Sequence, residues 1–118
     1  MVKIEQLAES AIKGESLLTR SLTQEFFREN HRLNEIPCPL TNDPIILAAS
    51  AALIELFATR MKQAPPAWTK KIGHATEPVF LLKAATTMKN LRTLCETESP
   101  EPLRKRGFYA PPNYLEFV

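Results

Sequence analysis

The sequence predicts an all-α fold: a compact bundle of about five to six helices around one central apolar helix. Apolar residues recur at helical spacing along most of the 118-residue chain, and no run shows convincing strand-like alternation. The composition is that of an ordinary folded domain, with 44% hydrophobic and 24% charged residues. Because this length suits one hydrophobic core, we expect a single domain over residues 1–118.

Two helices are predicted before the first prolines, one on each side of Gly14. Apolar residues at i, i+3, i+4 and i+7 spacing predict the first over about residues 3–13 and the second over about 16–34. A glycine inside a helix costs roughly 1 kcal/mol relative to alanine. We therefore expect a break at Gly14, and one continuous helix is the alternative.

The strongest local signal is the start of the central helix. Asp43 can accept hydrogen bonds from the free N–H groups of a first helical turn, and Pro44 suits the first helical position. The helix that follows, about 44–63, is apolar on nearly all sides, and Glu55 is the one charge between residues 45 and 58. Such a helix is buried on most sides. The apolar stretch is too short to span a bilayer, so we expect no membrane association.

Shorter helical pieces are predicted in the second half of the chain. One or two turns are expected over 67–72, a helical segment over about 77–97 with a break near Thr86, and short turns over 100–106. The aromatic tail that begins at Phe108 is expected to pack back on the bundle, with at most one short strand there.

Catalytic and metal sites are not indicated by the residue types that usually form them. His31, His74, Cys38 and Cys95 lie too far apart in sequence for the short ligand spacing of a zinc site. A Cys–His pair is conceivable for Cys38, but nothing supplies its base or an oxyanion site. We expect no enzyme, no metal and no cofactor. Without a secretory signal, and with two distant cysteines, a cytoplasmic protein with reduced thiols is expected.

Positive charge is concentrated in the second half of the chain. The net charge is +2, and residues 64–118 contain eight Lys or Arg against five Asp or Glu. Cations there are interleaved with aromatic residues, and these form the candidate partner-binding set: Trp68, Lys70, Lys71, Arg104, Lys105, Arg106, Phe108 and Tyr109. Such a set can bind an acidic protein, or phosphates and stacked bases. Cations near helix C-termini can equally be solvated groups that stabilise the helix dipole, and a lone tryptophan can be a core residue.

Several motifs occur in one order: LTNDP at 40–44, the alanine-rich helix, PPAWT at 65–69, ESP at 98–100 and RKRGF at 104–108. This order resembles a family of small bacterial helical proteins with an LTGDP turn, an alanine-rich helix, a PAW turn and an RRG ending. The resemblance covers about residues 33–110. Asn42 replaces the glycine of the turn, and the aromatic-rich stretch after the PAW turn is missing. The resemblance implies a stand-alone, antitoxin-like partner-binding protein and supplies no catalytic residues.

We therefore expect a non-catalytic protein-interaction module, the antitoxin-like member of a toxin–antitoxin-like pair that binds and restrains a partner protein. The alternative is a nucleic-acid-binding regulator that uses a basic C-terminal surface. The sequence leaves the identity of the partner open, and a homo-oligomer is compatible with either function.

Overall fold

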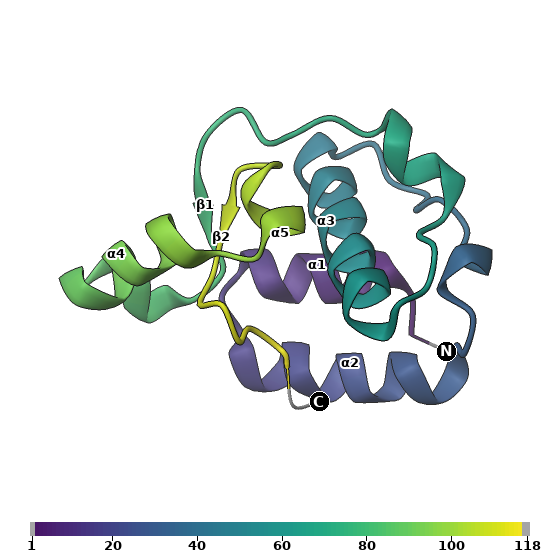
Figure 1. The fold of residues 1–118 in the computed structure, drawn as a ribbon, viewed down its shortest axis with the longest axis horizontal. Helices are drawn as coiled ribbons and strands as arrows, with labels where there is room; N and C mark the ends of the chain where they lie inside the picture. The colour runs from purple at the N-terminus through teal and green to yellow at the C-terminus, as the bar shows by residue number, and fades with distance from the viewer. Residues whose placement is uncertain (1, 117–118) are drawn as a thin grey trace.

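The predicted all-α bundle is confirmed in the computed structural model, which describes residues 2–116. Helix α3 (Pro44–Met61) forms the centre, and α1 (Ile4–Ile12) packs against both α3 and α2 (Ser16–Glu29) (Figure 1). The short helix α5 (Glu101–Arg104) packs against α3 as well. The core is therefore built around the helix that the sequence places at its centre.

Gly14 separates the first two helices, and one continuous helix is not formed. Its backbone φ of 72° lies in the left-handed region, where glycine is favoured and where a helix cannot continue. Across this turn, the buried hydroxyls of Ser10 and Thr19 form a hydrogen bond of 2.7 Å. The bond satisfies two polar groups between α1 and α2 that would otherwise be costly to bury.

Helix α2 ends at Glu29, five residues before the predicted end at 34. The Asn30 side chain donates to the Phe26 carbonyl and helps to close the last turn, and the Asn30 backbone is extended. Leu33 is fully buried in a short 3-10 helix, η1 (Leu33–Glu35), and its N–H donates to the Gln63 side chain at 3.0 Å. Packing of Leu33 at the end of α3 thus outweighs continuation of the α2 helix.

Helix α3 begins as predicted. The Asp43 carboxylate accepts a hydrogen bond from the Ile45 N–H at 2.9 Å, and Pro44 occupies the first turn. The helix ends at Met61, because Lys62 takes a left-handed backbone with φ of 57°. By length and hydropathy α3 could cross a membrane, but 61% of its 18-residue window is buried inside the protein, as in the central helix of a packed core.

The predicted helical segment over 77–97 is wrong in its first part. Residues Val79–Phe80 form strand β1, which pairs in parallel with β2 (Phe108–Tyr109). A short 3-10 helix, η3 (Lys83–Thr86), and helix α4 (Lys89–Glu98) follow, so the break predicted near Thr86 is present. A short apolar run suits a strand or a helix equally by periodicity, and here backbone pairing with the C-terminal segment decides.

The end of the chain packs back on the bundle as predicted, as far as residue 116. Phe108 is fully buried and Tyr114 is 6% exposed. The Arg60 side chain of α3 donates to the Tyr114 carbonyl and fixes this segment. Residues 117 and 118 of the predicted tail lie outside the described part. Helix α4 extends away from the body of the molecule (Figure 1), and the 3-10 helix η2 (Ala67–Lys71) fills the position predicted for turns over 67–72.

Candidate functional site

Arg106, a predicted partner-binding residue, holds the fold together instead. Its side chain is 7% exposed, and its guanidinium nitrogens lie 2.9 and 3.0 Å from the Glu55 carboxylate. The same group donates to the backbone carbonyls of Thr69, Ile72 and Gly73. These contacts use the donors of a guanidinium fully, as a buried charge requires. Arg106 therefore joins the C-terminal segment, α3 and the end of η2.

Arg106 belongs to the basic triplet Arg104–Lys105–Arg106, and the other two side chains of this triplet have different surroundings. Arg104 is exposed and donates weakly to the Thr97 carbonyl at 3.4 Å, whereas Lys105 lies 3.4 Å from Glu55. Phe108 is 0% exposed and belongs to the core. The triplet and its neighbouring aromatic residue do not form the continuous basic surface that nucleic-acid binding would use.

The remaining candidates divide into two groups. Trp68, Lys70 and Lys71 lie on η2, and Tyr109 lies on β2, on the other side of α3 in Figure 1. The Tyr109 ring is half-buried and lies 5.5 Å from the Phe80 ring. Lys70 and Lys71 are exposed. The partner-binding role of both groups stays a prediction.

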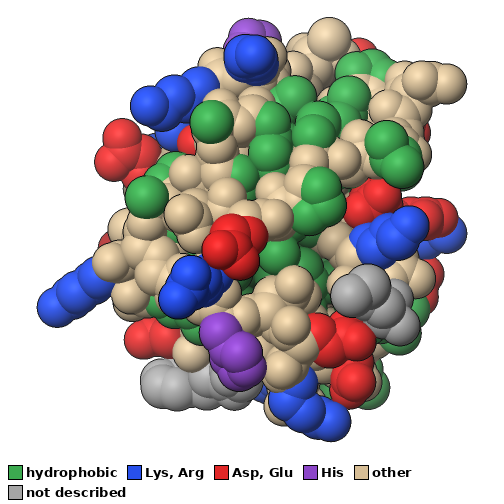
Figure 2. All heavy atoms as spheres, turned by 90° about the vertical axis from the view of Figure 1, so that its right-hand side faces the viewer, with side chains coloured by type: hydrophobic (Ala, Val, Ile, Leu, Met, Phe, Trp, Pro, Cys, Tyr) green, Lys and Arg blue, Asp and Glu red, His purple; other side chains and the backbone are tan. Residues whose placement is uncertain are grey.

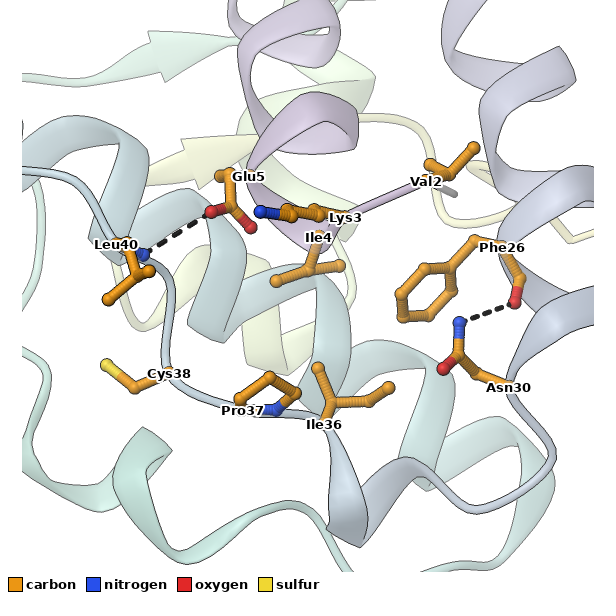
Figure 3. Close-up of a pocket in the computed structure, with 10 residues that line it drawn as sticks. All are labelled: Val2, Lys3, Ile4, Glu5, Phe26, Asn30, Ile36, Pro37, Cys38 and Leu40. Atoms are coloured by element: carbon orange, nitrogen blue, oxygen red, sulfur yellow. Dashed lines mark hydrogen bonds between the residues drawn. The ribbon is translucent and has the colours of Figure 1, made fainter.

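A pocket of about 280 Å³ opens on a different part of the surface. It lies between the start of α1, the end of α2 and the loop over 36–40 (Figure 3). Ile4, Phe26 and Ile36 project into it and are at most 7% exposed, so they form an apolar floor. Its lining residues are Val2, Lys3, Ile4, Glu5, Phe26, Asn30, Ile36, Pro37, Cys38 and Leu40.

The loop that forms one wall of the pocket is held by side chains from two other elements. The Trp68 indole donates to the Ile36 carbonyl at 2.8 Å. The Glu5 carboxylate accepts from the Leu40 N–H at 3.3 Å. Prolines within the loop restrict its backbone further. The wall is thus fixed before any ligand binds, which reduces the entropy lost on binding. Trp68 therefore supports the pocket wall, a role that differs both from direct partner contact and from a purely core residue.

The opposite wall of the pocket is formed by the start of the described chain and the end of α2, and a hydrogen bond joins these two segments. The Val2 N–H donates to the Glu29 carboxylate at 2.8 Å, which ties the start of the chain to the end of α2. Asn30 donates to the Phe26 carbonyl, so its side-chain oxygen remains directed toward the pocket in Figure 3. A polar acceptor thus stands beside an apolar floor, the usual composition of a specific binding site.

Leu40 is a large hydrophobic residue that is 90% exposed to solvent, and it lies at the edge of the pocket. Two shallower hollows border the same loop, one along residues 29–37 and one along residues 39–42. On the face shown in Figure 2, hydrophobic side chains gather in a band with charged side chains around it. An apolar centre with a polar rim is the usual anatomy of a protein interface.

The cysteines and histidines are dispersed, and they differ in their surroundings. Cys38 is exposed at the pocket, whereas Cys95 is buried in the core and burial raises the pKa of its thiol. The His74 ring contacts the Ala75 carbonyl, and His31 is exposed in the short segment between α2 and η1. Among residues 2–116, no three His, Cys, Asp or Glu side chains are grouped as metal ligands.

Sequence reasoning missed this pocket because its residues come from three separate segments. One signal was present: an apolar, proline-containing run at 36–40 that cannot be helical and yet precedes a buried helix. No protein-family model, no curated protein and no solved structure matches this chain. The functional proposals that follow therefore depend on the chain's own residues.

Proposed function

We propose that this protein is a non-catalytic interaction module that receives an apolar side chain of a partner protein in the pocket between α1, α2 and the 36–40 loop. One observation carries the proposal: a preformed apolar pocket of about 280 Å³ with the 90% exposed Leu40 at its edge. Partner-binding energy is concentrated where an apolar anchor fills such a pocket and excludes water.

A protein partner suits this site better than a nucleic acid. The pocket floor is apolar, and the two charged residues among those that line the pocket, Lys3 and Glu5, carry opposite charges. Nucleic-acid sites concentrate positive charge to neutralise phosphates. The basic triplet that supported the nucleic-acid alternative is divided, since Arg106 is buried and Lys105 lies beside Glu55. No observation therefore favours the regulator as a second function.

The finer role follows from the sequence resemblance. An antitoxin-like protein restrains its partner by covering a surface that the partner needs for activity. Within this proposal, the partner is a toxin-like protein of the same cell, and occupation of the pocket keeps it inactive. The predicted candidates on η2 would contact the same partner, because Trp68 adjoins the pocket wall through Ile36.

The test uses one pair of matched variants. Leu40→Asp changes an exposed residue at the pocket, and Leu17→Asp changes a residue that is 86% exposed at the start of α2, away from it. Both variants should fold, because neither side chain is in the core. Tagged wild-type protein and Leu17→Asp should capture the same partner from the native cell, whereas Leu40→Asp should lose it.

The affinity for the purified partner should then be measured by calorimetry. Leu40→Asp should bind at least about tenfold more weakly, a difference of about 1.4 kcal/mol. Equal affinities for the three proteins would exclude the pocket as the binding site. Failure of the wild-type protein to capture any partner under gentle conditions would count against the interaction module itself.

A further inference from the structure

The pocket and a side chain suited to fill it lie on the same face of the molecule. Leu40 is 90% exposed and forms part of the pocket edge, while Ile4 and Phe26 form the floor and are at most 2% exposed. A projection and a complementary depression on one face satisfy the requirement of a two-fold interface, in which each copy gives and receives the same contact.

We propose that this face pairs with the same face of a second copy, each copy placing Leu40 in the pocket of the other. This inference goes beyond the proposed function, because it requires no partner protein. It also adds regulation to that function, since the paired copies would cover the site that the partner needs. The partner would then bind only to the separated form.

The size of the pocket suits this occupant. An engineered apolar cavity of about 150 Å³ already holds a benzene molecule, and the pocket here measures about 280 Å³. The four carbons of a leucine side chain fit this volume. The Glu5 carboxylate accepts a hydrogen bond from the Leu40 N–H and holds this part of the pocket wall in place. The backbone that carries the Leu40 side chain is therefore fixed before pairing.

The charges around the pocket permit self-association. Lys3 and Glu5 flank its mouth with opposite signs, and Arg32 lies 3.6 Å from Glu35 on the neighbouring hollow. A two-fold rotation places the two copies of each such pair in opposite orientations, so a cation of one copy can lie opposite an anion of the other. A face of one sign would repel its own copy, because like charges across an interface are unfavourable.

The first test is the molecular mass of the purified protein by sedimentation at increasing concentration. Wild-type protein should form a dimer, and Leu40→Asp should weaken the dimer by at least about tenfold in Kd. Leu17→Asp should leave the Kd unchanged, since Leu17 is 86% exposed but lies outside the pocket. A wild-type monomer up to about 0.5 mM, or equal dimers in all three proteins, would overturn the proposal.

The second test blocks the depression rather than the projection. Cys38 is exposed at the pocket, whereas Cys95 is fully buried with a raised thiol pKa, so a bulky maleimide should label Cys38 selectively. The labelled wild-type protein should be monomeric. Cys38→Ser treated in the same way should remain dimeric, and dimerisation of the labelled protein would exclude the pocket as the contact.

The two proposals fail in different ways. If the purified protein is monomeric but captures a partner that Leu40→Asp loses, the proposed function holds and self-pairing is wrong. If the protein dimerises through Leu40 and captures no partner, self-pairing holds and the proposed function is wrong. If both are correct, adding the purified partner should convert dimers into heteromeric complexes.

Discussion

The guanidinium of Arg106 lies 2.9 Å from the carboxylate of Glu55, although the two residues are 51 positions apart in the chain. Glu55 is near the middle of α3, and its side chain is 12% exposed. The contact therefore places the last third of the molecule against its central helix. Because Arg106 also holds carbonyls at the end of η2, one side chain connects three segments.

Replacing Arg106 should strongly destabilise the protein. Arg106→Leu removes the guanidinium from the Glu55 carboxylate and from three backbone carbonyls, and leaves the half-exposed Lys105 as the cation beside Glu55. Breaking such a buried pair costs about 3–5 kcal/mol. Urea denaturation followed by circular dichroism measures the loss. Arg104→Ala is the matched control, because Arg104 is exposed, and it should change stability by less than about 0.5 kcal/mol. A loss below about 1 kcal/mol for Arg106→Leu would contradict the structural role of this residue.

Trp68→Phe should loosen the pocket wall while keeping an aromatic ring in place. The variant lacks the donor to the Ile36 carbonyl, and a net loss of about 1 kcal/mol is expected. Compared with the wild-type protein, the variant should show a larger increase in the rate of amide hydrogen exchange in the 36–40 loop than in α1. Lys70→Ala, on the exposed side of the same 3-10 helix, should leave that exchange unchanged. Unaltered exchange in Trp68→Phe would mean that the loop is held by its other contacts.

Gly14 and Gly73 should respond in opposite directions to alanine. At Gly14 the backbone φ is 72°, and an added Cβ would lie 2.5 Å from the Lys83 Cγ. Gly14→Ala should therefore cost about 1–2 kcal/mol. An added Cβ at Gly73 meets nothing within 4 Å, so Gly73→Ala should be neutral or should stabilise by up to about 1 kcal/mol. Thermal melting of both variants distinguishes backbone strain from a general effect of substitution.

Tyr114 should contribute to unfolding at alkaline pH. Burial raises its pKa above the ordinary value of about 10, so above that pH the unfolded chain loses a proton that the folded protein keeps. Stability should fall as pH rises beyond 10, by up to about 1.4 kcal/mol per pH unit from this group. Tyr114→Phe should reduce that slope.

Cys95, whose thiol pKa burial also raises, contributes equally to the wild-type protein and to Tyr114→Phe. The comparison between these two proteins between pH 9 and pH 11.5, at constant ionic strength, therefore isolates the tyrosine. Identical slopes would show that Tyr114 ionises as readily in the folded state as in the unfolded chain.

Local signals in the sequence were enough to predict most helices. Asp43 and Pro44 define the start of α3, and Gly14 separates α1 from α2, because capping and backbone preference act within a few residues. The strand at Val79–Phe80 was not predictable in this way. Its backbone partners are Gly107 and Tyr109, far along the chain.

The candidate site depended still more on tertiary structure. The sequence grouped Arg106 with exposed cations because it neighbours Arg104 and Lys105, but its partner Glu55 comes from a distant helix. The pocket likewise unites Ile4, Phe26 and residues of the 36–40 loop. The periodicity of apolar residues within one segment cannot predict that three distant segments come together in the folded protein.

The pairing of β1 with β2 makes the protein a practical scaffold for insertion. Backbone hydrogen bonds between β1 and β2 hold together the two ends of the excursion that contains α4, and α4 itself extends outward (Figure 1). A reporter domain introduced at the exposed Thr87, in the turn between η3 and α4, would be carried on the opposite side of the molecule from the pocket. Tags for imaging or for tethering can therefore be grafted there without obstructing the surface that carries Leu40.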